Sequence, residues 1–161
     1  MDEDKTGHIH RVPISRNDRV KAEPQVSCAE EEVGGVIRDL IASVDRGTYI
    51  PPSPRKDNPA LSEEYVFDTA DEKYILKDLK LENFVGKIKD LSKGAVRRMA
   101  KGYSQEYLYV FMYACKLSRR ESLGSAEKER ILIYIKVNNR KEPVKQVIVI
   151  SFHRNHLENK K

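Results

Sequence analysis

The sequence has little cysteine, no tryptophan and no long apolar run. Its two cysteines, Cys28 and Cys115, are too few and too far apart for a disulfide framework or a cysteine-based metal site. No apolar run reaches the roughly 18 residues that a membrane-spanning helix needs, and the N-terminus lacks the apolar core of a signal peptide. These absences predict a cytoplasmic protein that has no membrane partner.

The basic part of the chain also lacks the grouped carboxylates and histidines that a catalytic metal requires. His153 and His156 are three residues apart, a spacing that chelates a metal only where the chain is helical, and no third ligand is near them in the sequence. No serine or cysteine stands in a nucleophile motif. We therefore expect neither a metal nor a cofactor.

Charge is divided unevenly along the 161 residues, although the formal net charge is only +5. Residues 1–86 contain 12 basic and 18 acidic residues, which gives −6, and residues 87–161 contain 18 basic and 7 acidic residues, which gives +11. A half this basic is typical of a protein that contacts phosphates. A basic surface that only keeps the protein soluble is the alternative.

The order of patterns predicts an α+β protein. Residues 1–30 mix both charges without periodicity and indicate a polar arm or tail, whereas residues 31–161 indicate a single domain. Within this domain we expect helices between residues 32 and 101, packed on an antiparallel sheet of three or more strands between residues 103 and 154. The length of the chain fits one such domain.

Four helical segments are expected. The first runs from Glu31 to Gly47, with acidic residues at its start and a glycine at its end. After a proline-rich crossing at residues 51–59, a second helix is predicted from Ser62 to about Leu81, with a break in its apolar stripe near Thr69.

The third and fourth helices are short. Phe84, Ile88 and Leu91 have helical spacing and predict the third. Ser92 is the expected N-cap of the fourth, which ends at Gly102. We expect the fourth helix to point Val96 and Met99 inward and to present its cations on the other face: Lys93, Arg97, Arg98 and Lys101.

The predicted sheet begins with a strand at residues 103–117 that is apolar on both faces and therefore buried. After a polar loop at residues 118–129, two runs rich in Ile and Val are joined by the turn NNRKEP and predict a hairpin. Alternation places Tyr134 and Lys136 on one face of the first run. On the second run it groups Val147, Val149, Ser151 and His153 on one face and Ile148, Ile150 and Phe152 on the other.

Side chains of this kind can cleave RNA without a metal, because RNA carries its own nucleophile. The 2′-hydroxyl must lose a proton, the phosphate must be stabilised and the leaving 5′-oxygen must gain a proton. We predict Tyr134 and His153 as proton-transfer groups, with Arg97 or Arg98 and Lys136 on the phosphate. Further substrate-binding candidates are Lys101, Lys116 and Arg154. A tyrosine that only packs and a histidine at a solvated rim are the simpler interpretations.

These residues lie in patterns that resemble the MqsR-type mRNA-interferase toxins, within the RelE- and barnase-like ribonucleases. The resemblance covers about 80 residues, half of the chain. It rests on Leu91-Ser92 with Met99, Tyr103-Ser104 with Tyr113, Lys116-Leu117, IYIKV at residues 133–137 and VIVISF at residues 147–152.

The resemblance implies helices on one side of a twisted antiparallel sheet, cleavage of single-stranded mRNA without a metal, and neutralisation by an antitoxin protein. The helix lysine of the family corresponds to Arg98 or its neighbour Arg97, its strand tyrosine to Tyr134, and the lysine after its Ser-Phe pair to His153. Its glutamine corresponds to Val110, which cannot hydrogen-bond to substrate, so another residue such as Tyr109 would have to serve. The acidic N-terminal arm and the loop at residues 118–129 have no counterpart in the family.

Three functions therefore remain open from the sequence. The first is a metal-independent endoribonuclease that acts by transesterification. The second is a non-catalytic RNA-binding or regulatory protein on the same scaffold. The third is a protein-interaction module whose sheet edge accepts a partner strand. The oligomeric state is equally open.

Overall fold

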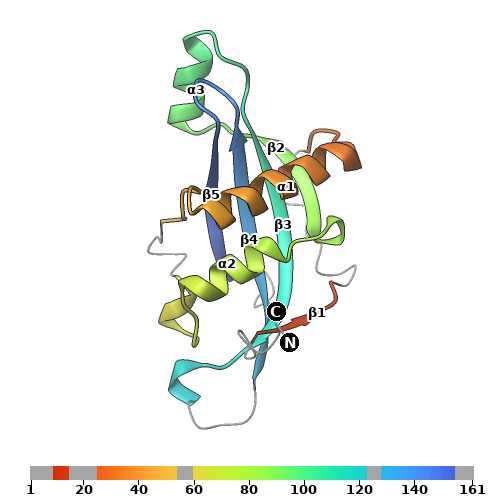
Figure 1. The fold of residues 1–161 in the computed structure, drawn as a ribbon, viewed down its shortest axis with the longest axis vertical. Coiled ribbons are helices and arrows are strands. Elements are labelled where there is room, and N and C mark those ends of the chain that lie inside the picture. Colours follow the sequence, from red (N-terminus) through yellow and green to blue (C-terminus); the bar gives the residue numbers. More distant parts are fainter. Residues whose placement is uncertain (1–8, 15–24, 54–59, 123–127, 155–161) are drawn as a thin grey trace.

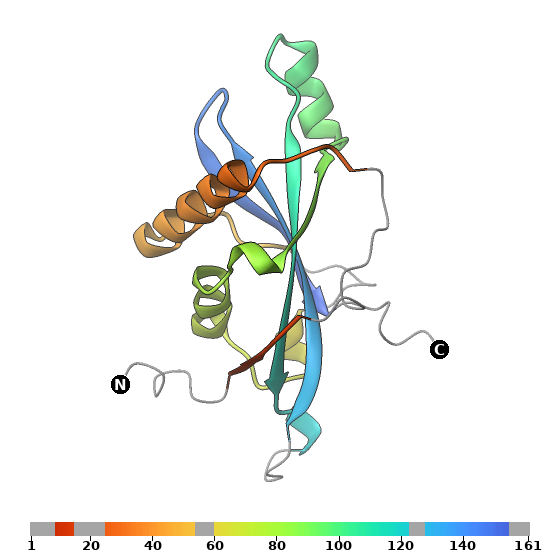
Figure 2. The same cartoon turned by 90° about the vertical axis from the view of Figure 1, so that its right-hand side faces the viewer.

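The structure is a computed structural model that describes residues 9–14, 25–53, 60–122 and 128–154. In this part of the chain, three α-helices accompany a five-stranded antiparallel sheet, which confirms the α+β class. The elements are β1 (His10–Val12), α1 (Glu30–Arg46), α2 (Thr69–Lys77), β2 (Phe84–Lys89), α3 (Lys93–Ala100), β3 (Tyr107–Leu117), β4 (Glu129–Arg140) and β5 (Gln146–Arg154), with short 3-10 helices at Leu61–Glu63, Leu81–Asn83 and Arg120–Ser122. Helices α1 and α2 cover one face of the sheet, and α3 lies at one end of the molecule (Figures 1 and 2).

Strand β3 is the centre of the sheet. On one side it pairs with β4, which pairs with β5; on the other side β1 and β2 share its edge, with His10 opposite Lys116 and Lys89 opposite Tyr107. The sheet thus includes two strands from outside residues 103–154. The prediction of a helix at residues 84–91 was wrong, because Gly86 and Ile88 alternate with more exposed neighbours in the two-residue period of a strand.

Helix α1 has the predicted limits. Its first turn carries three acidic residues, which the helix dipole favours, and Gly47 ends it in the left-handed conformation with φ of 71°. Helix α2 begins at Thr69, where the break was expected, and its N-cap is Asp68 and not Ser62. The Asp68 carboxylate accepts from the backbone N–H of Asp71 at 3.0 Å, and the Asp71 carboxylate accepts from that of Asp68 at 2.9 Å, so the two form a capping box.

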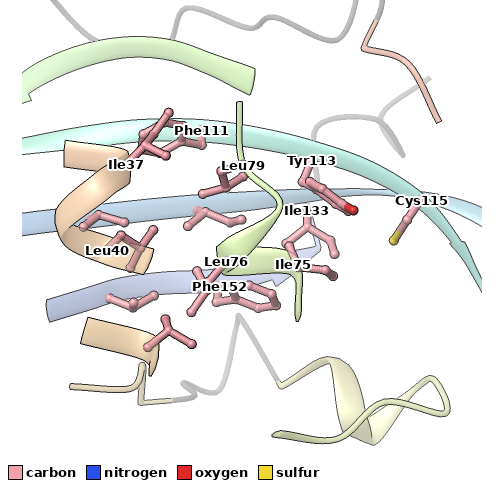
Figure 3. Packing of buried hydrophobic residues seen from close by; sticks show 14 of the residues in the cluster. Ile37, Leu40, Ile75, Leu76, Leu79, Phe111, Tyr113, Cys115, Ile133 and Phe152 are labelled. Atoms are coloured by element: carbon pink, nitrogen blue, oxygen red, sulfur yellow. The ribbon is translucent and has the colours of Figure 1, made fainter. Parts of the chain in front are cut away.

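One large core lies between α1, α2 and the sheet face that they cover. Leu40 of α1 and Ile75 and Leu76 of α2 are fully buried against Phe111 of β3 and Ile133 of β4 (Figure 3). Alternate residues of β3 face the other way, where Met112 and Ala114 form a smaller cluster with Leu132. Both faces of β3 are therefore apolar and buried, as predicted, but the strand begins at Tyr107 and not at Tyr103 as expected.

The hairpin of β4 and β5 contains an irregularity that changes which residues face the core. Val137 lies opposite Val149 and Lys136 lies opposite Ser151, so Ile150 is an extra residue in β5. The predicted uniform alternation along β5 was therefore wrong. Phe152 joins Val147 and Val149 in the core, whereas Ile150 is exposed. Strand β4 also continues to Arg140, which places both asparagines of the predicted turn in the strand.

Helix α3 has the predicted N-cap, because the Ser92 hydroxyl accepts from the backbone N–H of Ala95 at 3.3 Å. The predicted inward direction of Val96 and Met99 was wrong: their exposed fractions are 46% and 41%, and Ala95 is the buried residue. The reason is that α3 extends beyond the sheet and packs on it with one narrow side only (Figure 2). Among the described residues, no helix is both long enough and apolar enough to cross a bilayer.

Candidate functional site

Tyr134, Lys136 and His153 lie together on the sheet face turned away from α1 and α2. Tyr134 is directly opposite His153 across β4 and β5, and the centroids of the two rings are 5.6 Å apart. The Lys136 Nζ atom lies 5.5 Å from the centroid of the Tyr134 ring. All three side chains are half-buried. A phenol, an ammonium group and an imidazole therefore meet on one surface.

The extra residue in β5 creates this arrangement. Val149 faces the core, so an unbroken alternation would turn His153 toward the core as well. The shift at Ile150 instead places Ser151 and His153 beside Lys136 and Tyr134. Bulges commonly re-aim a side chain next to a functional site.

A backbone contact favours one tautomer of the His153 ring. Its Nδ1 atom lies 2.9 Å from the carbonyl oxygen of Arg154. A carbonyl oxygen can only accept, so this hydrogen bond requires the proton on Nδ1 and leaves the lone pair of the neutral ring on Nε2. The Nε2 atom is thus the basic nitrogen of this side chain.

A cavity of about 350 Å³ borders the site at the edge of the sheet. It is lined by β5, by the start of α2 and by the chain before α2, and His153 and Ser151 contribute to its wall. Pockets of a few hundred Å³ are of the size that proteins use for small organic groups. His153 therefore adjoins a space large enough for a part of a substrate.

Arg98 does not join this group. Its guanidinium forms a two-pronged ion pair with Glu106, which has a side-chain exposure of only 8%. Glu106 also accepts from Asn138, four residues along β4 from Tyr134, which is about 13 Å at the rise of a strand. Arg97 is exposed on the same helix as Arg98. The structure thus separates both arginines from Tyr134 and His153.

The polar cluster around Asn138 was not anticipated from the sequence. The Asn138 amide donates to Asp90 and to Glu106, both at 2.9 Å, and all three side chains are buried. Hydrogen bonds from Arg98 and Asn138 hold the pKa of Glu106 below its ordinary value although burial alone would raise it. A signal existed, since Asn138 continues the alternation of Tyr134 and Lys136, but the pair Asn138-Asn139 resembles a turn.

Two other candidates lie on the face that α1 and α2 cover. The Tyr109 hydroxyl donates to Glu32 of α1, and burial together with this hydrogen bond raises the pKa of Tyr109. Arg154 lies opposite Ile133 of the core, and its Nη2 atom is 3.2 Å from a carboxylate oxygen of Glu129. Both residues therefore lie on the opposite sheet face from Tyr134.

The remaining candidates are exposed cations. Lys116 is on the same sheet face as Tyr134, opposite Arg130 and therefore also about 13 Å from Tyr134 along β4. Lys101 follows α3 at the end of the molecule. Within the described residues, no group of three or more His, Cys, Asp and Glu side chains could hold a metal ion. His156 lies outside the described residues.

The fold and this site together define an α+β domain with a tyrosine, a lysine and a histidine grouped on the sheet face opposite its helices. No family model, curated protein or solved structure matches the chain.

Proposed function

We propose that the protein is a metal-independent endoribonuclease that cleaves RNA by transesterification. The observation that carries the proposal is the grouping of Tyr134, Lys136 and His153, with the two rings 5.6 Å apart. These are the three kinds of group that the reaction needs, and the +11 charge of residues 87–161 suits a polyanionic substrate.

The chemistry assigns one role to each group. The His153 Nε2 atom takes the proton of the 2′-hydroxyl, whose oxygen attacks the adjacent phosphorus while the bond from phosphorus to the 5′-oxygen breaks. Tyr134 donates its proton to the departing 5′-oxygen, and the Lys136 ammonium stabilises the negative charge that grows on the phosphate. The products are a 2′,3′-cyclic phosphate and a 5′-hydroxyl.

A non-catalytic RNA-binding protein is the second candidate, and one observation favours it. The Arg98 guanidinium is held by Glu106 at a distance from Tyr134, and Val110, directly opposite Lys136 on β3, has no polar atom to offer. The phosphate would then have a single cation at the site. A binding protein needs cations for affinity but no proton transfer.

Incubation of the purified chain with single-stranded RNA and EDTA separates the two candidates. The ribonuclease gives fragments that end in a cyclic phosphate, and His153→Ala and Tyr134→Phe each lower the rate about a hundredfold or more, as expected for loss of a proton-transfer group. Tyr74→Phe on α2, a half-buried tyrosine far from the site in the sequence, is the matched control and keeps the wild-type rate.

Retention of RNA must be measured beside cleavage. In the ribonuclease, both active-site variants bind RNA nearly as well as the wild type does. A wild-type chain that retains RNA in a salt-dependent manner without cutting it would replace the first candidate by the second. Equal cleavage by the wild type and by both variants would remove Tyr134 and His153 from the reaction.

A further inference from the structure

One end of the molecule gathers exposed apolar side chains. This end, which we call the tip, consists of α3 with Leu91 and Tyr103 beside it, and of the link between β4 and β5 at residues 141–145 (Figures 1 and 2). Of the eight large apolar side chains that are exposed among the described residues, five are at the tip: Leu91, Val96, Met99, Tyr103 and Val144. Exposed apolar side chains that gather in one place commonly mark an interaction surface.

Helix α3 differs from an ordinary surface helix, because its large apolar side chains face solvent and not the sheet. The residues that it turns toward the sheet are Ala95 and Arg98, one with almost no apolar area and the other charged, whereas Val96 and Met99 are in solvent. Folding therefore gains little from the apolar residues of this helix. Apolar residues at exposed positions that do not stabilise the fold are expected where function requires them.

The tip is also strongly basic. From Leu91 to Gln105 the chain has four cations and no acidic residue. Arg98 is neutralised by Glu106, but Lys93, Arg97 and Lys101 are exposed and form no ion pair with any other described residue. Because they recur every four residues, they form one stripe along α3, next to Val96 and Met99.

The two parts of the tip are joined. The backbone N–H of Ser104 donates to a Glu142 carboxylate oxygen at 3.1 Å, which ties the residues after α3 to the β4–β5 link. This link adds Val144 together with Lys141 and Lys145, whose ammonium groups lie 3.1 and 3.7 Å from Asp39. Apolar side chains and cations therefore occupy one end of the molecule.

We infer that the tip binds the surface of a bilayer that contains anionic lipids. The stripe of cations contacts the headgroups, while Leu91, Val96 and Met99 enter the boundary between headgroups and acyl chains. The exposed apolar side chains favour lipid over RNA, because bases stack on aromatic rings and only Tyr103 of the five is aromatic. Such binding requires no membrane-spanning segment, but it departs from the prediction made from the sequence that the protein has no membrane partner. It is independent of the proposed ribonuclease activity.

Flotation with vesicles tests this inference. We expect the wild-type chain to float with vesicles of phosphatidylcholine and phosphatidylserine, not with phosphatidylcholine alone, and to be released by salt. The variant Lys93→Gln/Arg97→Gln/Lys101→Gln loses about fivefold in partitioning for each cation removed. The variant Leu91→Gln/Val96→Gln/Met99→Gln also loses most of the binding. All six side chains are exposed, so their replacement removes few contacts and we expect both variants to fold.

Matched controls change the same kinds of residue elsewhere. Leu81, which is 46% exposed like Val96, and Ile50 are replaced by Gln in the apolar control, and Arg46, Lys77 and Lys80 are replaced by Gln in the charge control. Both controls keep the binding of the wild type to anionic vesicles. Thermal unfolding of every variant verifies that it is folded.

Several results would overturn the inference. They are failure of the wild type to bind anionic vesicles, equal losses in the tip variants and their controls, and unchanged binding in the apolar tip variant. Two further results would reassign the tip. If the apolar tip variant lost retention of single-stranded RNA but kept vesicle binding, the surface would be an RNA site; if the wild type dimerised and that variant did not, it would be an interface between copies of the chain.

Discussion

Asn138 shows how a single residue attaches an exposed helix to the sheet. Its amide group donates one hydrogen to Asp90, which precedes α3, and the other to Glu106, which follows α3. Arg98 in the middle of α3 binds the same Glu106. Since Ala95 is the only residue of α3 that is buried, these polar contacts are a large part of the contacts between α3 and the sheet.

We predict that Glu106→Gln lowers the free energy of unfolding by about 2 kcal/mol at neutral pH, because the variant leaves Arg98 and Asn138 without their charged acceptor. The pKa of Glu106 is lower in the folded chain than in the unfolded one, so the folded state binds fewer protons there. Its contribution is complete above the unfolded pKa and disappears as the pH falls through the folded pKa.

The difference in stability between wild type and Glu106→Gln should therefore shrink as the pH is lowered below about 4, the ordinary range of a glutamate. Urea denaturation at neutral and acidic pH measures it. Glu63→Gln, at an exposed position in a 3-10 helix, is the control and changes little at either pH. A constant difference across the pH range would mean that the charge of Glu106 has no part in stability.

At the scale of elements, strand β5 is the one in which the sequence pattern does not predict which residues are buried. Phe152 is 6% exposed and packs against Phe67, with ring centroids 5.9 Å apart, whereas Ile150 is 37% exposed. A regular strand would have given these two residues the same environment. The extra residue at Ile150 makes one of them part of the core and leaves the other in solvent.

Truncation of the two side chains should therefore have unequal effects. We predict that Phe152→Ala lowers the free energy of unfolding by about 3 kcal/mol through the cavity it leaves, and that Ile150→Ala changes it by less than about 0.5 kcal/mol. Chemical denaturation of both variants provides the measurement. Equal losses would indicate that β5 is regular and that His153 faces the core.

The success of sequence reasoning depended on whether the signal was local. Gly47 ends α1 and Ser92 caps α3 as predicted, because each acts through the backbone next to it. Periodicity failed at Phe84, Ile88 and Leu91, since three apolar residues with helical spacing do not exclude pairing with a distant strand such as β3. The same limit applies to Val96 and Met99: their spacing defines a helix face but not what lies against it.

The candidate site, too, was predicted only where the signal in the sequence was local. Alternation predicted that Tyr134 and Lys136 share a face, and they do. The position of His153 beside them depends on the extra residue in β5, for which the sequence gives no evident signal. The ion pair between Arg98 and Glu106 depends on how the chain turns between α3 and β3, and no rule of sequence spacing predicts that turn.

At the scale of the whole molecule, the N-terminal segment is partly integrated into the domain. The predicted arm contributes β1, and Arg11 of this strand donates to Asp78, Glu82 and Asn83 at 2.7 to 3.1 Å while its guanidinium lies 5.5 Å from the centroid of the Tyr113 ring. Residues 1–8 and 15–24 of the arm lie outside the described residues.

We predict that Arg11→Ala destabilises the protein by about 2 kcal/mol, because it removes hydrogen bonds from the partly buried Asp78 and the buried Asn83. Arg11→Lys restores only part of the loss, since one ammonium group cannot reach acceptors on three residues. Arg38→Ala, an exposed arginine on α1, is the control for thermal unfolding. If Arg11→Ala melted at the wild-type temperature, β1 would not contribute to the stability of the domain.

The position of β3 in the chain governs when this protein can fold during synthesis. Strands β1 and β2 pair with β3, and α1 and α2 pack on the sheet that it organises, yet β3 begins only at Tyr107. During synthesis, β1, α1, α2 and β2 therefore emerge from the ribosome before the strand on which they pack, and a helix of 17 residues such as α1 is barely stable alone. The complete sheet, and the core beneath α1 and α2, can therefore form only after β3, β4 and β5 have been translated.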